Sequence, residues 1–234
     1  MNKADPPVVV LISANAEWLP VLAYYQNPSL VGSPYGGYFQ QTILGQSLIF
    51  FKSGWGKISA AASTQYAIQA FAPRLLINLG TCGGFEGKIN PGEVFLAEET
   101  QVYDIYERMG DAAQALEHYF TRLDLSFLRE PFPQAVRRGK LISADQDTDP
   151  VLVPHLVDQY QAVAADWESG AIAWTAAQNH IPCLILRGVS DVVSPENGDS
   201  SYANLAVFHR SAESIMKDLL DALPGWIECS LDAK

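Results

Sequence analysis

Short apolar runs alternate with helical segments along almost the whole chain, and this alternation restricts the possible folds more than any other feature. The apolar runs, which resemble buried strands in length and composition, are residues 8–12, 75–79, 93–97, 139–143, 162–165 and 183–189. The helical segments are residues 17–25, 59–71, 150–159, 169–178 and 203–223. Strands that alternate with helices pair into one sheet with helices on both faces, so the pattern predicts an α/β fold with a mostly parallel sheet.

Three segments depart from the alternation. Residues 36–44 and 47–52 lie on either side of a Gly45-Gln46 turn and predict a β-hairpin. Residues 107–133 are polar and irregular, which favours short helical pieces between loops. Residues 80–84 have the sequence Gly-Thr-Cys-Gly-Gly, follow the second predicted strand directly, and predict a glycine-rich turn.

Length and charge restrict the class of protein. With 234 residues, of which 48% are hydrophobic, the chain can bury one sizeable core, so we expect a single domain over residues 1–234. The formal net charge is -11, and no cluster of Lys or Arg relieves it locally. Because this charge repels phosphate backbones and anionic lipid, we expect no nucleic-acid partner and no membrane partner.

Cysteine and histidine are too scattered to predict a metal centre or a disulfide framework. The cysteines are Cys82, Cys183 and Cys229, without CxxC spacing, and the four histidines also lack ligand spacing. We therefore expect no metal and no cofactor. Cys82 has no neighbouring His to activate it, which favours a packed residue over a nucleophile. No apolar run is long enough for a secretory signal or a membrane span, so we expect a cytoplasmic protein.

Polar residues follow four of the predicted strands, where ligands bind in open α/β sheets. The four segments are residues 13–17, 80–84, 166–169 and 187–191. Three of them carry a carboxylate, namely Glu17, Glu168 and Asp191. If these side chains converge, they can supply what cleavage of an N-glycosidic bond needs: a proton for the leaving base, a negative charge beside the cationic sugar, and a base for water.

Each of these residues also has a structural interpretation. Glu17 and Glu168 stand near helix starts, where the helix dipole favours a carboxylate. Asp166 and Asp191 could cap turns or helices, as Asp commonly does after a strand. Residues 80–84 could form a simple turn or a cradle of backbone N–H groups for an anion or a hydroxyl. Their position after four separate strands favours the functional interpretation.

Five segments, in this order and spacing, resemble the nucleoside phosphorylase superfamily. They are residues 12–17, 53–57, 77–84, 166–168 and 187–191. The chain is most similar to the branch of methylthioadenosine/S-adenosylhomocysteine nucleosidases. That resemblance implies a three-layer sandwich with a central, mostly parallel mixed sheet. It also implies hydrolysis of 5'-methylthioadenosine or S-adenosylhomocysteine to adenine and the 5'-thio-substituted ribose, a role in methionine salvage, and a homodimer.

The resemblance also implies roles for particular residues. Glu17 would activate the attacking water, Glu168 would hold the ribose hydroxyls, and Asp191 would serve purine N7. Ser190 would orient Asp191. Thr81 stands where relatives usually carry a serine that helps place the water.

Further positions bear on the substrate. Gly83 could offer a backbone N–H to a bound group. Trp167 replaces the usual methionine at the ribose face, and Asp147 falls where many relatives carry an apolar or aromatic residue over the purine. With Asp147 in that place we expect a preference for adenine. Tyr202 aligns with an aromatic residue of the pocket for the 5' substituent.

The residues favour hydrolysis over phosphorolysis. Phosphorylases of this superfamily place arginines around the phosphate, whereas Asn78 occupies one of those positions here and the loop after the first strand carries Glu17. Arg187 is the arginine within the matching segments that could still reach a phosphate. The alternatives are a futalosine-type or other purine nucleoside hydrolase, a phosphorylase, and a storage protein without activity.

Overall fold

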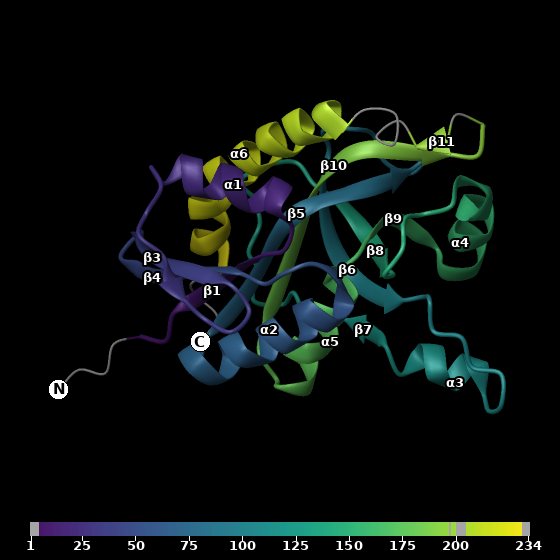
Figure 1. The fold of residues 1–234 in the computed structure, drawn as a ribbon, viewed down its shortest axis with the longest axis horizontal. Coiled ribbons are helices and arrows are strands. Elements are labelled where there is room, and N and C mark those ends of the chain that lie inside the picture. The colour runs from purple at the N-terminus through teal and green to yellow at the C-terminus, as the bar shows by residue number, and fades with distance from the viewer. Residues whose placement is uncertain (1–4, 197, 200–204, 231–234) are drawn as a thin grey trace.

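The computed structural model describes residues 5–196, 198–199 and 205–230 and contains one β-sheet with helices on both faces (Figure 1). The strands are β1 (Val8–Ile12), β2 (Val31–Gly32), β3 (Gly37–Ile43), β4 (Gln46–Lys52), β5 (Leu75–Phe85), β6 (Val94–Val102), β7 (Phe120–Arg122), β8 (Arg137–Ser143), β9 (Ala162–Asp166), β10 (Cys183–Ser194) and β11 (Gly198–Asp199). The helices are α1 (Asn15–Tyr24), α2 (Gly56–Phe71), α3 (Ala112–Glu117), α4 (Val153–Tyr160), α5 (Ser169–Gln178) and α6 (Leu205–Ser230). A short 3₁₀ helix (Pro150–Leu152) precedes α4.

The sheet is mixed, with the strand order β11-β10-β6-β8-β9-β5-β1-β4-β3-β2 and β7 paired to β6. Parallel pairs join β1 to β4 and β5, β5 to β10, and β8 to β6 and β9. Because β10 also pairs with β6, and β9 with β5, the strands β5, β10, β6, β8 and β9 close into a ring. The predicted α/β class is confirmed.

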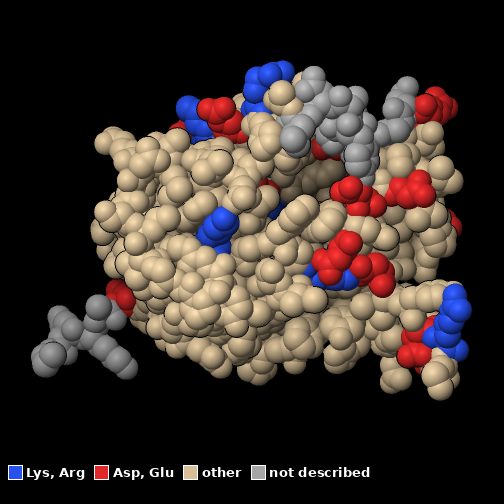
Figure 2. All heavy atoms as spheres, in the orientation of Figure 1, with Lys and Arg blue, Asp and Glu red and all other residues tan. Residues whose placement is uncertain are grey.

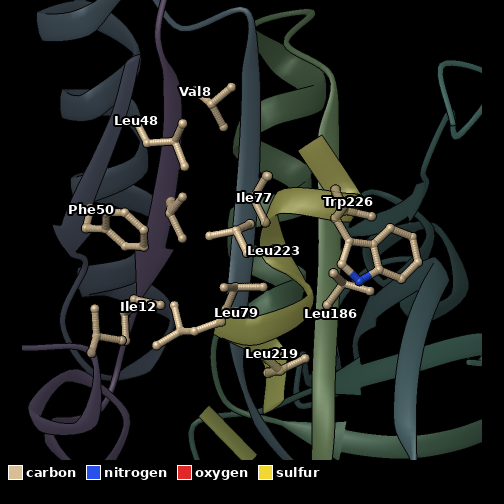
Figure 3. Close-up of a cluster of buried hydrophobic side chains, with 14 of the residues drawn as sticks. Val8, Ile12, Leu48, Phe50, Ile77, Leu79, Leu186, Leu219, Leu223 and Trp226 are labelled. Carbon is tan, nitrogen blue, oxygen red and sulfur yellow. The ribbon is translucent and has the colours of Figure 1, made fainter. Parts of the chain in front are cut away.

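The two faces of the sheet hold separate hydrophobic clusters. In β1 alternate residues point to opposite faces, so Val8 and Ile12 join one cluster and Val9 joins the other. The first cluster lies under α1 and α6 and includes Trp226 (Figure 3). The second lies under α2 and α5, whose small alanines allow close packing against the sheet. Burial on both faces explains why the strands read as continuous apolar runs.

The predicted glycine-rich turn at residues 80–84 is wrong, because β5 continues through it to Phe85. Parallel pairing with β10, from Leu76 to Phe85 of β5, satisfies the backbone of this segment. Gly80 is required by a close approach, since a Cβ atom there would lie 1.9 Å from Nη1 of Arg187. β10 also extends past its predicted end at residue 189 and carries Ser190 and Asp191.

The other predicted elements differ mainly in length. α2 begins three residues before the predicted start at 59, and α6 runs to Ser230 instead of 223. The irregular segment 107–133 contains α3 and β7. Over the described part of the chain, no helix is both long enough and apolar enough to cross a membrane.

Candidate active site

Glu17, Glu168 and Asp191 line one cavity of about 440 Å³, although they are spread over most of the chain. The cavity lies where β9 ends and α1 and α2 begin, and β5 and β10 contribute to its wall. Two larger surface hollows, of about 790 and 610 Å³, lie against β6 and β8 and contain none of these three residues. The convergence follows from the parallel strands, whose carboxyl ends meet at one edge.

Glu17 is held through both carboxylate oxygens. It is the third residue of α1 and is buried. Its Oε2 accepts the Ala14 N–H at 3.1 Å, which closes a hydrogen-bonded turn at the start of the helix. Its Oε1 accepts both the N–H (2.7 Å) and the Oγ1–H (3.0 Å) of Thr81 in β5. The structural interpretation of Glu17 is therefore confirmed, since its carboxylate caps α1, and the same carboxylate faces the cavity.

Glu168 lies between β9 and α5 and is also buried. Its Oε1 accepts the N–H of Gly56, the first residue of α2, at 3.0 Å. Burial, followed by the negative charge of Asp166, raises the pKa of Glu168 to about 8, although Arg187 opposes the shift. Glu168 can therefore hold a proton near neutral pH, and a carboxyl group in that state both donates and accepts hydrogen bonds.

Asp191 lies inside β10 and not after its end, where the sequence interpretation placed it. The strand register shifts between Val189 and Asp191, as in a β-bulge. In a regular strand consecutive side chains point to opposite faces, whereas here both Ser190 and Asp191 line the cavity. The Ser190 hydroxyl contacts the Asp191 carboxylate and lies 3.2 Å from the carbonyl oxygen of Cys82.

A fully buried arginine joins the carboxylates from behind the cavity wall. Arg187 Nη2 lies 2.8 Å from Asp166 Oδ2 and donates to Asn78 Oδ1 at 2.7 Å. Its Nε donates to Ser169 Oγ at 3.0 Å, and Nη1 lies 3.7 Å from Glu17 Oε1. Asp166 also accepts the N–H of Ser169, the first residue of α5, at 3.2 Å, although the N-cap residue of this helix is Glu168. The positive charge of Arg187 compensates two buried carboxylates.

Two tryptophans form another part of the cavity wall. The rings of Trp55 and Trp167 are stacked, with centroids 5.0 Å apart and an interplanar angle of 24°. Each precedes a partner of the Gly56–Glu168 hydrogen bond, so the stack lies beside that bond. The sequence interpretation included Trp167 but not Trp55, whose signal was its place between two glycines in the matching segment 53–57.

The other predicted site residues have definite places. Thr81, Gly83 and Asp147 line the cavity, and Tyr202 lies outside the described residues. The cavity wall also contains residues that the sequence interpretation did not select as site residues: Ala14, Gln146, Thr148, Ala165, Val193 and Phe208. Apart from Ala14, which belongs to the matching segment 12–17, these residues lie outside the matching segments and come to the wall only through the folding of the chain. The roles of the predicted residues stay predictions.

Cys82 also lines the cavity, but it is buried and burial raises the pKa of its thiol far above the ordinary value. A thiol that stays protonated is a poor nucleophile, which favours the packed-residue interpretation. Over the residues that the structure describes, no group of three or more His, Cys, Asp or Glu side chains could hold a metal ion.

Comparisons with known proteins identify the family of the chain. The family model of the phosphorylase superfamily matches residues 8–223. A 5'-methylthioadenosine/S-adenosylhomocysteine nucleosidase of Bacillus cereus is 30% identical over 192 residues, which cover 76% of this chain and 82% of that protein. One from Psychromonas ingrahamii is 25% identical over 199 residues, which cover 80% of this chain and 86% of that protein.

Solved structures share the fold. The Helicobacter pylori 5'-methylthioadenosine/S-adenosylhomocysteine nucleosidase, in complex with a substituted pyrrolidin-3-ol, matches with a TM-score of 0.78 and 17% identity, over 94% of this chain and 99% of that chain. Futalosine hydrolase of Helicobacter pylori matches with a TM-score of 0.76 and 17% identity, over 93% of this chain and 97% of that chain.

Proposed function

The chain belongs to the phosphorylase superfamily, within the family of 5'-methylthioadenosine/S-adenosylhomocysteine nucleosidases, and from that premise we propose that it hydrolyses the N-glycosidic bond of such a nucleoside. The products are adenine and the 5'-thio-substituted ribose. The observation that carries the proposal is the convergence of Glu17, Glu168 and Asp191 in one cavity. Each carboxyl group then has one task in the reaction.

Asp191 delivers a proton to the departing purine. A leaving purine needs that proton at a ring nitrogen as the bond to the sugar breaks. The Ser190 hydroxyl contacts one oxygen of the Asp191 carboxyl and so fixes its orientation. The neighbouring residue in the strand ladder, Gly83, has no side chain to block the approach of a base to Asp191.

Glu17 accepts the proton of the attacking water. Each of its oxygens already accepts a hydrogen bond from the protein, which fixes the carboxylate, yet a carboxylate has about four acceptor positions in all. A water molecule that Glu17 holds beneath the sugar is then already oriented for attack on the sugar. Arg187 lies 3.7 Å from Glu17 and compensates its negative charge.

Glu168 binds the ribose hydroxyls. The N–H of Gly56 takes one hydrogen-bonding position on Oε1 of Glu168, and the ribose hydroxyls bind at the remaining hydrogen-bonding positions of the carboxyl group. As the sugar gains positive charge in the transition state, the carboxyl groups of the site stabilise it. Trp167, the residue before Glu168 in the chain, lies beside the sugar.

The environment of two residues disfavours phosphate as the nucleophile. Asn78 is buried, donates to the Leu11 carbonyl oxygen at 3.0 Å and accepts from Arg187. Arg187 is fully buried and paired with Asp166. With these groups engaged and the Glu17 carboxylate beside them, the site suits neutral water better than a phosphate dianion.

We propose in addition a single domain, a homodimer and a cytoplasmic role in methionine salvage. The apolar side chain of Ile58, in the first turn of α2, is 83% exposed and supports an interface there. Analytical ultracentrifugation of the purified chain tests the dimer.

The test of the proposed function is a panel of nucleosides assayed for release of free base. The panel contains 5'-methylthioadenosine, S-adenosylhomocysteine, futalosine and inosine, each with and without inorganic phosphate. We expect phosphate-independent release of adenine and a free reducing sugar, fastest for the thio-substituted adenosines. Strict phosphate dependence with a sugar 1-phosphate product would overturn hydrolysis. A clear preference for futalosine would overturn the substrate, and no release at all would support a storage role.

A further inference from the structure

The cavity wall is strongly acidic. Five of its residues carry carboxyl groups, namely Glu17, Asp147, Asp166, Glu168 and Asp191. Among the described residues of the wall there is no Lys, Arg or His. Arg187 lies behind the wall, fully buried, and its charge is taken up by Asp166 and Glu17. Although Glu168 holds a proton near neutral pH, the single charge of Arg187 cannot balance the other carboxylates of the wall, so the field inside the cavity is negative.

The rim of the cavity has the same sign. Figure 2 shows Asp and Glu side chains gathered on this face between the start of α2 and α4, with few Lys or Arg among them. Lys57, beside Trp55 and Gly56, is bound by Asp104 and lies 3.8 Å from Asp145, so its charge is more than balanced. An anion approaching the cavity meets repulsion at the rim and again inside.

The stacked tryptophans provide the only aromatic rings besides Phe208 among the described residues of the wall. Trp55 is two-thirds exposed, so part of its ring surface is open to a ligand. Tryptophan is the best side chain for a cation–π contact, which operates within about 6 Å of the ring. A sugar held at Glu168 lies beside this pair, and its substituents share a cavity of about 440 Å³.

We propose that the site selects nucleosides whose sugar carries a neutral or a cationic substituent, that a cationic group binds against the Trp55–Trp167 pair, and that anionic substituents such as phosphate are rejected. This inference rests on the proposed nucleosidase function and names the substrate class within it. Both the charge of the wall and the aromatic pair favour a cation, and neither depends on the other.

The test uses adenosine derivatives that differ only at the 5' position: 5'-amino-5'-deoxyadenosine, 5'-deoxyadenosine and adenosine 5'-monophosphate. We expect kcat/KM for adenine release to be about tenfold higher for the amine than for the neutral compound at low ionic strength. The phosphate should react at least about tenfold more slowly than the neutral compound. Added salt should narrow both ratios, because it screens the field.

Two variants test the aromatic contribution. Trp55→Leu should lower the ratio of amine to neutral kcat/KM about two- to fivefold, whereas Trp55→Phe, which keeps a ring, should retain most of it. Because Trp55 is largely exposed, both variants should fold, which thermal melts would verify. Equal kcat/KM for the amine and the neutral compound, or the same ratio in Trp55→Leu as in the wild type, would overturn the proposal.

A second measurement separates this inference from the proposed function. If none of the three compounds releases adenine, the nucleosidase function fails, and the charge preference is then tested by tryptophan fluorescence titration. The expected order of affinity is still amine, neutral, phosphate. Equal affinities, or tighter binding of the phosphate, would overturn the charge preference whatever the outcome for activity.

Discussion

The inner and the outer wall of the cavity are built in different ways. The inner wall consists of Glu17, Asp166, Glu168 and Asp191, which are all buried. The outer wall consists of loop residues such as Trp55 and Asp147, which are exposed. The sequence interpretation expects Glu17, Glu168 and Asp191 of the inner wall to match the superfamily, and Asp147 of the outer wall to depart from its usual pattern. Buried, mutually bonded groups tolerate little change, whereas exposed loops can vary and so adjust the choice of substrate.

The largest expected effect comes from the chemistry of the inner wall. Asp191→Asn keeps the shape of the side chain but cannot deliver a proton, so kcat should fall about 10²- to 10⁴-fold. The fold should stay intact by circular dichroism, and binding should be less affected than rate. Asp158→Asn, an exposed Asp on α4, is the matched control and should keep full activity. Near-normal turnover of Asp191→Asn would show that the proton comes from another group.

The second effect concerns the stability of the inner wall. Arg187→Met leaves the buried carboxylates of Asp166 and Glu17 without their compensating charge, so the free energy of unfolding should fall by about 3–5 kcal/mol. Urea denaturation at pH 7 measures it. Lys217→Met, which breaks the exposed Lys217–Asp221 pair on α6, is the control and should change stability little. If the two variants were equally stable, the buried network would not support the inner wall.

The third effect is the pH dependence that Glu168 gives the inner wall. Its pKa is raised in the folded chain, so between about pH 4.5 and 8 the folded state holds a proton that the unfolded state releases. Stability contributed by the protonated group is therefore lost as the pH rises, by at most about 1.4 kcal/mol per pH unit.

Glu168→Gln tests this slope. As the pH rises from 5 to 8, the free energy of unfolding of the wild type should fall relative to that of Glu168→Gln. Glu213→Gln, at an exposed position of α6, should run parallel to the wild type. A pH-independent difference for Glu168→Gln would mean that Glu168 ionises in the folded chain as it does in the unfolded chain.

The smallest effect belongs to the outer wall. A charged Asp147 accepts hydrogen bonds from amino groups, and Asn does so more weakly, so Asp147→Asn should lower the ratio of adenosine to inosine cleavage about tenfold or less. Thermal stability should hardly change, because the residue is exposed. An unchanged ratio of base release from the two nucleosides would remove Asp147 from base selection.

The elements and their class were predictable because their signals are local. The period of apolar residues marks β1, β4, β8, β9, α5 and their neighbours within a few residues of their bounds. The positions of Glu17 and Glu168 after strands were enough to predict that they face one cleft, since the carboxyl ends of parallel strands share an edge. Asp191 was predicted to lie in the same cleft for that reason, but it reaches the cleft from inside a strand.

What the sequence by itself determined about this protein is the order of strands and helices and the carboxylates at the strand ends. Only the tertiary structure decided that β5 and β10 continue through Gly80 and Asp191, because the hydrogen bonds that extend them come from a partner about 108 residues away. It also decided that Arg187 lies behind the wall and that Trp55 stacks on Trp167. Those contacts join segments far apart in the chain, and no local pattern records which distant side chain will fill the space beside a residue.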